Sequence, residues 1–188
     1  MIVAITGSHS TGKSTIVDFV KDNPKFVSLN SVTRSTITDK ERKIDGIDNL
    51  DNAQIKIMNN IISGVDDIVQ MNKQDPSKIY LMDRCVFDFI AYSRSFYKQG
   101  NLSKEVLNEI ESKCTNLYKH IDLFVYLPIE FDIVDDGVRS LDNNLRKNVD
   151  NEIKDLLKCN NINYITLKGN VNERIESLQN AINTVLNH

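Results

Sequence analysis

The feature that most constrains the fold of this chain is a short segment near its start, with glycines at two fixed positions ahead of a lysine and a hydroxyl residue. Its residues match the pattern G-x-x-x-x-G-K-[S/T] in full: Gly7, Ser8, His9, Ser10, Thr11, Gly12, Lys13, Ser14 and Thr15. An apolar run, Ile2–Thr6, precedes them, and a segment of helical spacing, about Lys13–Val20, follows. A strand before the pattern and a helix after it separate a true match from a chance Gly-rich turn.

The residue types of this segment suit a chain of phosphates. Gly7 and Gly12 allow main-chain N–H groups to turn towards phosphate oxygens at places where a Cβ would collide. The helix that begins near Lys13 directs its N-terminal N–H groups at the same anion. Lys13 adds a positive charge for the β- and γ-phosphates, and the Ser14 hydroxyl is suited to coordinate Mg²⁺. The segment predicts an ATP and Mg²⁺ site with residues 7–15 as contacts; whether the side chains of His9 and Ser10 touch phosphate, or only their backbone contributes, stays open.

Short apolar runs alternate with longer stretches of helical spacing along the rest of the chain. Strands are expected at residues 2–6, 26–29, 79–82, 122–127 and 164–167. Helices are expected at about residues 13–20, 50–71, 86–97, 104–118 and 171–186, with a further helical stretch towards Leu157. Strands separated by helices imply parallel pairing through right-handed crossovers. The sequence therefore predicts one α/β domain over residues 1–188, with a parallel sheet covered by helices on both faces.

Composition narrows the classes of function. The formal net charge of −3 disfavours nucleic acid as a partner without excluding it, because nucleic-acid-binding surfaces are usually basic. No apolar run approaches the roughly 18 residues of a membrane span, and the first residues lack the basic region of a signal peptide. Cys85, Cys114 and Cys159 lie too far apart for a metal or disulfide motif and predict free thiols. With an Asn-, Ile- and Lys-rich composition, these features predict a cytoplasmic protein, of a microbe or of a virus-infected host cell.

A second candidate site follows the third predicted strand. Asp83 ends that strand, so its carboxylate is expected at the same edge of the sheet as the loop. There it would hold Mg²⁺ or accept a proton from an attacking hydroxyl, and Arg84 offers a planar fork for phosphate. The alternative is an Asp83–Arg84 ion pair of structural value only. Asp88 and Tyr92 share one face of the next helix and either line an acceptor pocket or belong to the core.

These residues carry a resemblance to a known family. The segment from Asp83 to Tyr92 resembles the D-R…A-Y segment of thymidylate kinase and its deoxynucleoside kinase relatives. Over nearly its whole length the chain is similar to the small P-loop kinases typified by the nicotinamide riboside kinase domain of bifunctional NAD-synthesis regulators. That family has a later D-G-x-R…R…D segment, matched here by Asp136, Gly137, Arg139, Arg146 and Asp150. The resemblance implies a P-loop NTPase fold, with a five-stranded parallel sheet in the order 2-3-1-4-5 and an arginine-bearing lid.

The lid is expected at about residues 129–150, where the sequence is charged and poor in large apolar residues. Phosphoryl transfer concentrates negative charge on the moving group, so cationic side chains that arrive on closure lower the barrier. Arg139 and then Arg146 are the candidates, with Gly137 as a hinge. The alternative is a solvated surface, because the aspartates of this segment nearly neutralise its arginines.

The acceptor is indicated by one departure from the family pattern. Members that phosphorylate a sugar hydroxyl commonly carry an acid shortly before an arginine that follows the second strand. Arg34 matches that arginine, and Ser31 stands where the acid aligns. A hydroxyl acceptor benefits from a base near neutral pH, whereas a phosphate acceptor is already anionic. The departure favours a nucleoside monophosphate whose phosphate binds Arg34 and Arg84; Asp83 as a base and Arg34 as a plain surface residue stay open.

The loop, the Asp83–Arg84 pair and the lid pattern together predict a small-molecule kinase. It would transfer the γ-phosphate of ATP, with Mg²⁺, to a nucleotide or nucleoside, in first place a (deoxy)nucleoside monophosphate. Two alternatives stay open: a kinase of a hydroxyl on a nucleoside or on a modified base in DNA, and an NTPase or regulatory nucleotide-binding module. A homodimer also stays open.

Overall fold

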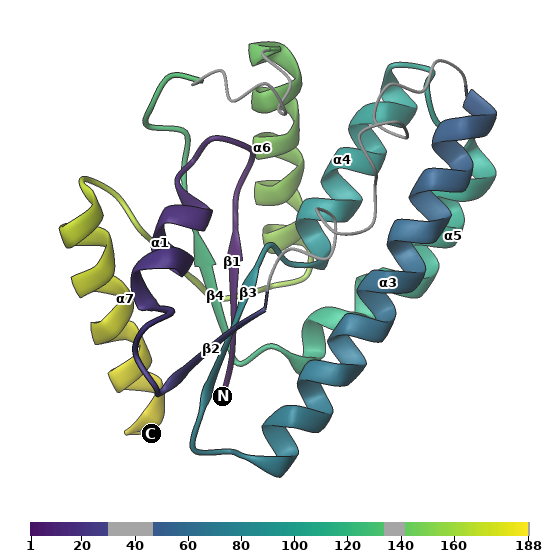
Figure 1. Ribbon diagram of the computed structural model, residues 1–188. Helices are drawn as coiled ribbons and strands as arrows, with labels where there is room; N and C mark the ends of the chain where they lie inside the picture. Colours follow the sequence, from purple (N-terminus) through teal and green to yellow (C-terminus); the bar gives the residue numbers. More distant parts are fainter. Residues whose placement is uncertain (30–46, 134–141, 188) are drawn as a thin grey trace.

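The computed structural model describes residues 1–29, 47–133 and 142–187 and is built on a parallel sheet (Figure 1). Its strands are β1 (Ile2–Thr6), β2 (Phe26–Leu29), β3 (Ile79–Asp83), β4 (Leu123–Tyr126) and β5 (Tyr164–Thr166). The strand order is β2-β3-β1-β4-β5, and every neighbouring pair is parallel. The predicted order 2-3-1-4-5 is therefore confirmed.

The central strand β1 shows why the apolar runs of the sequence are continuous rather than alternating. All of its residues are buried, because the sheet is covered on both faces and neither side of the strand meets solvent. Ala4 pairs with Met82 of β3 on one side and with Phe124 of β4 on the other. Strand β5 lies at the edge of the sheet, and Tyr164 there is exposed.

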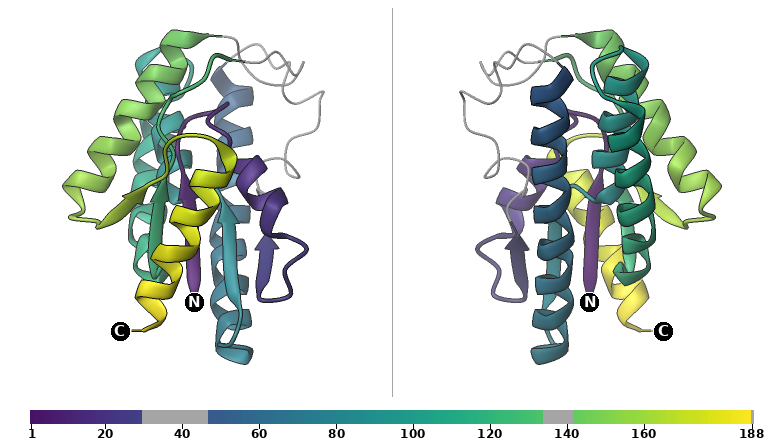
Figure 2. Two further views of the ribbon diagram at one scale, coloured as in Figure 1. Left: turned by 90° about the vertical axis from the view of Figure 1, so that its left-hand side faces the viewer. Right: turned by 90° about the vertical axis from the view of Figure 1, so that its right-hand side faces the viewer.

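Helices cover both faces of the sheet, as predicted (Figures 1 and 2). On one face α1 (Lys13–Val20) and α7 (Val171–Leu186) pack against Val3 and Ile5. On the other face the side chains of Ala4 and Phe124 belong to a core shared with the remaining helices. Those helices are α3 (Ile47–Gln74), α4 (Val86–Lys98), α5 (Lys104–Cys114) and α6 (Asn143–Cys159), with a 3-10 helix, η2, at Thr115–His120. In the described part of the chain, no helix combines the length and the hydropathy that crossing a bilayer requires.

Helix α6 occupies part of the segment that the sequence predicts as a lid. Asp142 begins it, since its side chain accepts hydrogen bonds from the N–H groups of Asn144 and Leu145 at 2.8 and 3.2 Å. Leu145 and Val149 then bury one face of the helix. The last part of the expected lid, residues 143–150, is therefore helical. Gly137 and Arg139 lie outside the described residues.

The last residue of the family-like D-G-x-R…R…D segment ties α6 to the sheet. The Tyr126 hydroxyl on β4 donates a hydrogen bond of 2.8 Å to Asp150, which is buried on α6. The other oxygen of Asp150 pairs with Lys154 at 2.6 Å. Burial, together with the neighbouring Asp150 carboxylate, raises the pKa of Tyr126, so its hydroxyl stays protonated and keeps donating. Asp150 thus fixes the helix that follows the lid segment.

Removing the Tyr126 hydroxyl tests its hydrogen bond to Asp150. Tyr126→Phe is expected to lower the free energy of unfolding by about 1 kcal/mol, because it removes one hydrogen bond and leaves a buried acceptor to Lys154 alone. Urea denaturation followed by circular dichroism measures the change. The matched control is Tyr97→Phe on α4, where the side chain is exposed and the change is expected to stay within about 0.5 kcal/mol. Equal stabilities for the two variants would contradict the assignment.

Candidate active site

The loop between β1 and α1 is forced into its shape by backbone angles that favour glycine. Gly7 has φ +148° and Gly12 has φ +90°, both in the range that side chains disfavour. A Cβ on Gly7 would lie 2.5 Å from the carbonyl oxygen of Leu127, just beyond β4, and would collide with it. Ser10, with φ +57°, adopts the left-handed conformation between them. The loop therefore curls at the carboxyl end of β1, as the sequence pattern predicts.

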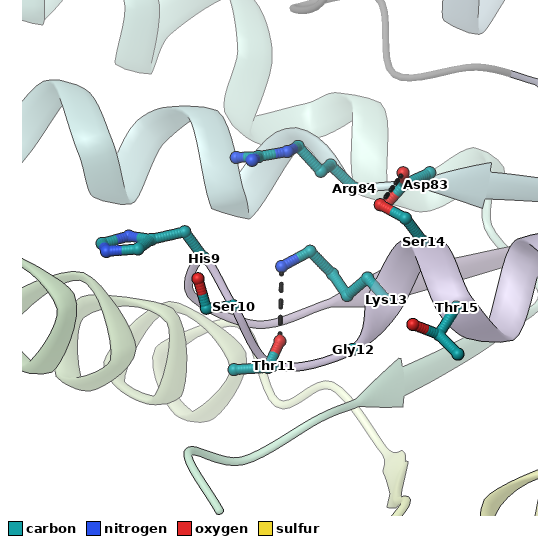
Figure 3. Close-up of a pocket in the computed structure, with 9 residues that line it drawn as sticks. All are labelled: His9, Ser10, Thr11, Gly12, Lys13, Ser14, Thr15, Asp83 and Arg84. Atoms are coloured by element: carbon teal, nitrogen blue, oxygen red, sulfur yellow. Dashed lines mark hydrogen bonds between the residues drawn. The ribbon is translucent and has the colours of Figure 1, made fainter. Parts of the chain in front are cut away.

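Lys13 points back into this curl rather than out to solvent (Figure 3). Its Nζ donates hydrogen bonds to the carbonyl oxygens of Gly7 and Ser8, at 2.5 and 2.6 Å. The same ammonium lies 4.0 Å from a carboxylate oxygen of Asp88. A buried positive charge surrounded by the loop backbone is suited to attract the phosphates of a nucleotide.

Ser14 and Asp83 face each other beside the lysine (Figure 3). The Ser14 hydroxyl donates to Asp83 Oδ2 at 3.0 Å. The other oxygen, Oδ1, is buried and has no hydrogen-bond partner among the described residues. One carboxylate and one hydroxyl form an oxygen donor set that fits Mg²⁺, which keeps several waters and usually takes its remaining ligands from phosphates. No group of three or more His, Cys, Asp or Glu side chains in the described ranges could hold a metal alone.

Arg84 follows Asp83 in a strained conformation. Its φ is +92°, which is unfavourable for any residue with a Cβ. Its guanidinium carbon lies 5.6 Å from the ring centroid of Tyr92 on α4, a distance typical of a cation–π contact. Burial lowers the pKa of Arg84, but the neighbouring Tyr92, Asp88 and Asp83 raise it by more. The net shift of the pKa is therefore upward. Arg84 is therefore a fixed positive charge next to the loop (Figure 3).

Tyr92 connects α4 to the loop. A hydrogen bond of 2.8 Å joins its hydroxyl to Nδ1 of His9. Burial raises the pKa of Tyr92, and the positive charge of Arg84 only partly offsets this, so the phenol stays neutral. His9, Arg84 and Tyr92 thus form one connected group in which a residue of the loop touches the predicted acceptor side of the site.

Asp88 is almost fully buried, with 1% of its surface exposed, and the loop and its own helix hold both of its oxygens. Oδ1 accepts the N–H of Gly7 at 3.2 Å, and Oδ2 accepts the N–H of Cys85 at 2.9 Å. The second contact caps the start of α4. Asp88 therefore fastens α4 to the loop, and its predicted part in acceptor binding stays a prediction. Burial raises the pKa of the Cys85 thiol, which keeps that thiol unreactive.

Two arginines bind the outer side of the loop. The guanidinium of Arg146 on α6 donates to the carbonyl oxygens of His9, Ser10 and Phe131, at 3.0, 2.8 and 2.8 Å. That of Arg174 on α7 donates to the carbonyl oxygen of Thr11 at 2.7 Å. The sequence predicts Arg146 as an arriving charge, whereas Arg174 is not among the predicted site residues. A signal for Arg174 exists: it shares an apolar helix stripe with Leu178 and Ile182, where a charge needs a partner.

Most of the predicted site residues thus meet at the carboxyl edge of the sheet. One pocket is lined by His9, Ser10, Thr11, Gly12, Lys13, Ser14, Thr15, Asp83 and Arg84 (Figure 3). Gly7 and Ser8 lie beneath Lys13, and Asp88, Tyr92 and Arg146 contact the loop from α4 and α6. Arg34 and Arg139, the remaining candidates, lie outside the described residues.

A family model described as an AAA domain matches residues 2–174. The chain belongs to this AAA-domain family. Among curated proteins, none matches the sequence.

Solved structures share the fold of this AAA-domain protein. Deoxyadenosine kinase from M. mycoides with dCMP and a flexible dCDP has a TM-score of 0.68 at 16% identity, covering 98% of this chain and 100% of the kinase. The same kinase with dATP has a TM-score of 0.70 at 14% identity, covering 97% and 99%. NadR in complex with NAD and AMP-PNP has a TM-score of 0.68 at 14% identity, covering all of this chain and 49% of NadR. The resemblance to P-loop nucleoside and nucleotide kinases is confirmed at the level of the fold.

The strain at Arg84 predicts that glycine stabilises the protein more than alanine at this position, the reverse of the usual order within a helix. Arg84→Gly and Arg84→Ala remove the same contacts, but only glycine adopts φ +92° without cost. The glycine variant is expected to be the more stable by about 1 kcal/mol in urea denaturation.

The matched pair is Arg94→Gly and Arg94→Ala within α4. There glycine is expected to be the less stable by about 1 kcal/mol, because it is a poor helix former. If alanine were also the more stable residue at position 84, the strained conformation would be refuted.

Proposed function

We propose that this protein is an ATP- and Mg²⁺-dependent kinase that transfers the γ-phosphate of ATP to a nucleotide or nucleoside. The observation that carries the proposal is the Ser14–Asp83 contact of 3.0 Å, set beside a loop that encloses the ammonium of Lys13. Together these groups bring hydroxyl, carboxylate, ammonium and main-chain N–H groups to one edge of the sheet. That combination suits the β- and γ-phosphates of ATP and the metal ion that accompanies them.

Each residue has a distinct part in the proposed reaction. The loop N–H groups and Lys13 hold the β- and γ-phosphates, for which Lys13 would leave its contacts with Gly7 and Ser8. Ser14 and Asp83 would hold Mg²⁺, which supplies neutralisation of phosphate charge when bound. Arg84 orients the acceptor through its positive charge. Arg139 is expected to reach the γ-phosphate when the part of the predicted lid ahead of α6 closes over it, excluding the water that would otherwise hydrolyse ATP.

The favoured acceptor is a (deoxy)nucleoside monophosphate. Arg84 is a fixed cation held against Tyr92 on the acceptor side of the loop, where a monophosphate would meet it. Arg34, outside the described residues, would be the second cation on the same phosphate. The similar kinase solved with dCMP and dCDP supports a site of this fold that accommodates deoxynucleotides.

A nucleoside hydroxyl is the second candidate acceptor. Asp83 Oδ1 is buried and unpartnered among the described residues, so it is available to accept a proton from a hydroxyl. The similar structures include a kinase named for deoxyadenosine and NadR in complex with NR, both of which fit a nucleoside acceptor. The two candidates use the same phosphate loop and differ only in what Arg84 and Asp83 contact.

A panel of acceptors tests the proposal. With ATP and Mg²⁺, ADP is expected to form only when a nucleoside or nucleotide is added, and mass spectrometry of the acceptor separates a new phosphate on a monophosphate from one on a hydroxyl. Lys13→Ala is expected to abolish transfer, whereas the control Lys21→Ala, on an exposed side chain, leaves it unchanged. Stoichiometric ATP hydrolysis without an acceptor would show an NTPase instead, and label passing from ATP to DNA would show a DNA kinase.

Arg139 provides a separate test of the closing segment. Arg139→Ala is expected to lower kcat at least about 100-fold, because a charge that stabilises only the transition state is lost. The dissociation constant of ATP, measured by calorimetry, is expected to change less than about threefold. Lys147→Ala, on an exposed residue of α6, is the control. Equal losses in kcat and in ATP affinity would show that Arg139 binds the ground state.

A further inference from the structure

The outer side of the phosphate-binding loop is held by two buried guanidinium groups. Three consecutive carbonyl oxygens, those of His9, Ser10 and Thr11, each accept a hydrogen bond from an arginine. Arg146 binds the first two at 3.0 and 2.8 Å, and Arg174 binds the third at 2.7 Å. Each arginine is only 2% exposed. No part of the phosphate chemistry described above uses these contacts.

Peptide geometry links these carbonyls to the phosphate site. In a trans peptide the C=O and the next N–H point in opposite directions. Holding the carbonyls of residues 9, 10 and 11 outwards therefore turns the N–H groups of Ser10, Thr11 and Gly12 to the opposite side. These three residues line the pocket that also contains Lys13 (Figure 3). The arginines thus fix the orientation of N–H groups that would meet a phosphate.

The two arginines are themselves fixed. Arg146 also donates to the carbonyl oxygen of Phe131 at 2.8 Å. Arg174 pairs with Glu130 at 2.7 Å, and its guanidinium carbon lies 4.8 Å from the ring centroid of Phe131. A Cβ on Gly12 would lie 3.1 Å from Arg174 Nη1, so the guanidinium is packed directly against the loop. Glu130 and Phe131, which follow β4, therefore hold both arginines in place.

The arginines approach the loop from the two faces of the sheet. Helix α6 belongs to the core on the side of Phe124, and α7 belongs to the core on the side of Val125. Burial of a guanidinium is costly, and a structure retains it only where hydrogen bonds compensate. The carbonyls of the loop provide that compensation here. Two positive charges behind the loop also favour an anion in front of it.

We propose that Arg146 and Arg174 are positioning residues that shape the phosphate-binding loop by holding its carbonyl oxygens outwards. The inference rests on the proposed function only in taking the loop as the site of the ATP phosphates. It assigns Arg146 a part in binding the ground state, unlike the arriving charge that the sequence predicts. The two parts differ in what is lost on mutation: a positioning residue affects phosphate affinity, whereas an arriving charge affects kcat alone.

The test uses inorganic tripolyphosphate, which probes the loop without a base or sugar, on the full chain with Mg²⁺. Arg146→Met and Arg174→Met are expected to weaken its binding at least about 10-fold in calorimetry, because the loop N–H groups lose their fixed orientation. The matched control is Arg94→Met. Arg94 pairs with Glu111 and Glu152 at 2.7 and 3.3 Å, away from the loop. Arg94→Met also removes a charge and the hydrogen bonds of a guanidinium, yet this variant is expected to bind tripolyphosphate like the wild type.

A second pair of variants guards against loss of folding. Arg146→Lys and Arg174→Lys keep the charge but lack the planar fork. They are expected to recover part of the affinity, more at 174, where one loop carbonyl is bound, than at 146, where two are bound. In ¹⁵N spectra, the amide signals of residues 10–12 are expected to shift with tripolyphosphate in the wild type and less in the methionine variants.

The outcomes separate this inference from the proposed function. Wild-type affinity in both methionine variants would overturn the inference and leave the kinase proposal intact, as would a loss of kcat alone. Weakened binding in these variants without any acceptor-dependent transfer would support the inference and overturn the kinase proposal. A wild-type protein that binds no tripolyphosphate would overturn both.

Discussion

The curled loop between β1 and α1 is the constraint on which the rest of the site depends. Its main chain must present N–H groups inwards while its carbonyl groups find partners elsewhere, since buried carbonyls without partners are costly. The carbonyl oxygen of Leu127 blocks any side chain at position 7. Asp88 accepts a hydrogen bond from the N–H of Gly7, and Arg146 and Arg174 donate hydrogen bonds to the outer carbonyl oxygens. The sheet, α4, α6 and α7 therefore all contribute to the shape of one short segment.

Much of the fold was predictable because its signals are local. Strands buried on both faces appear as continuous apolar runs, and β1 and β2 have the predicted bounds. The strand order came from the family resemblance rather than from any run of residues. The start of α6 was missed because its cap, Asp142, is one of several aspartates in a charged segment, and nothing in the sequence marks which of them accepts the N–H groups of Asn144 and Leu145.

The site was predictable where spacing along the chain determines it. The glycine–lysine–serine pattern places Lys13 and Ser14 at a helix start, and a strand that ends in Asp83 places its carboxylate at the same edge. The contacts of Asp88 and Arg174 were not predictable, because they are tertiary. Asp88 shares a helix face with Tyr92, but that spacing does not indicate that its carboxylate accepts the N–H of Gly7. Arg174 lies 163 positions from its carbonyl partner, Thr11, and only the packing of α7 brings them together.

The most direct test of the loop as the phosphate site is a crystal structure of the protein with a non-hydrolysable ATP analogue and Mg²⁺. The β-phosphate is expected inside the loop, in contact with the N–H groups of Ser10, Thr11 and Gly12, with Lys13 moved onto the phosphates. The metal is predicted beside Ser14 and Asp83. A triphosphate bound elsewhere, with Lys13 still on the carbonyls of Gly7 and Ser8, would contradict it.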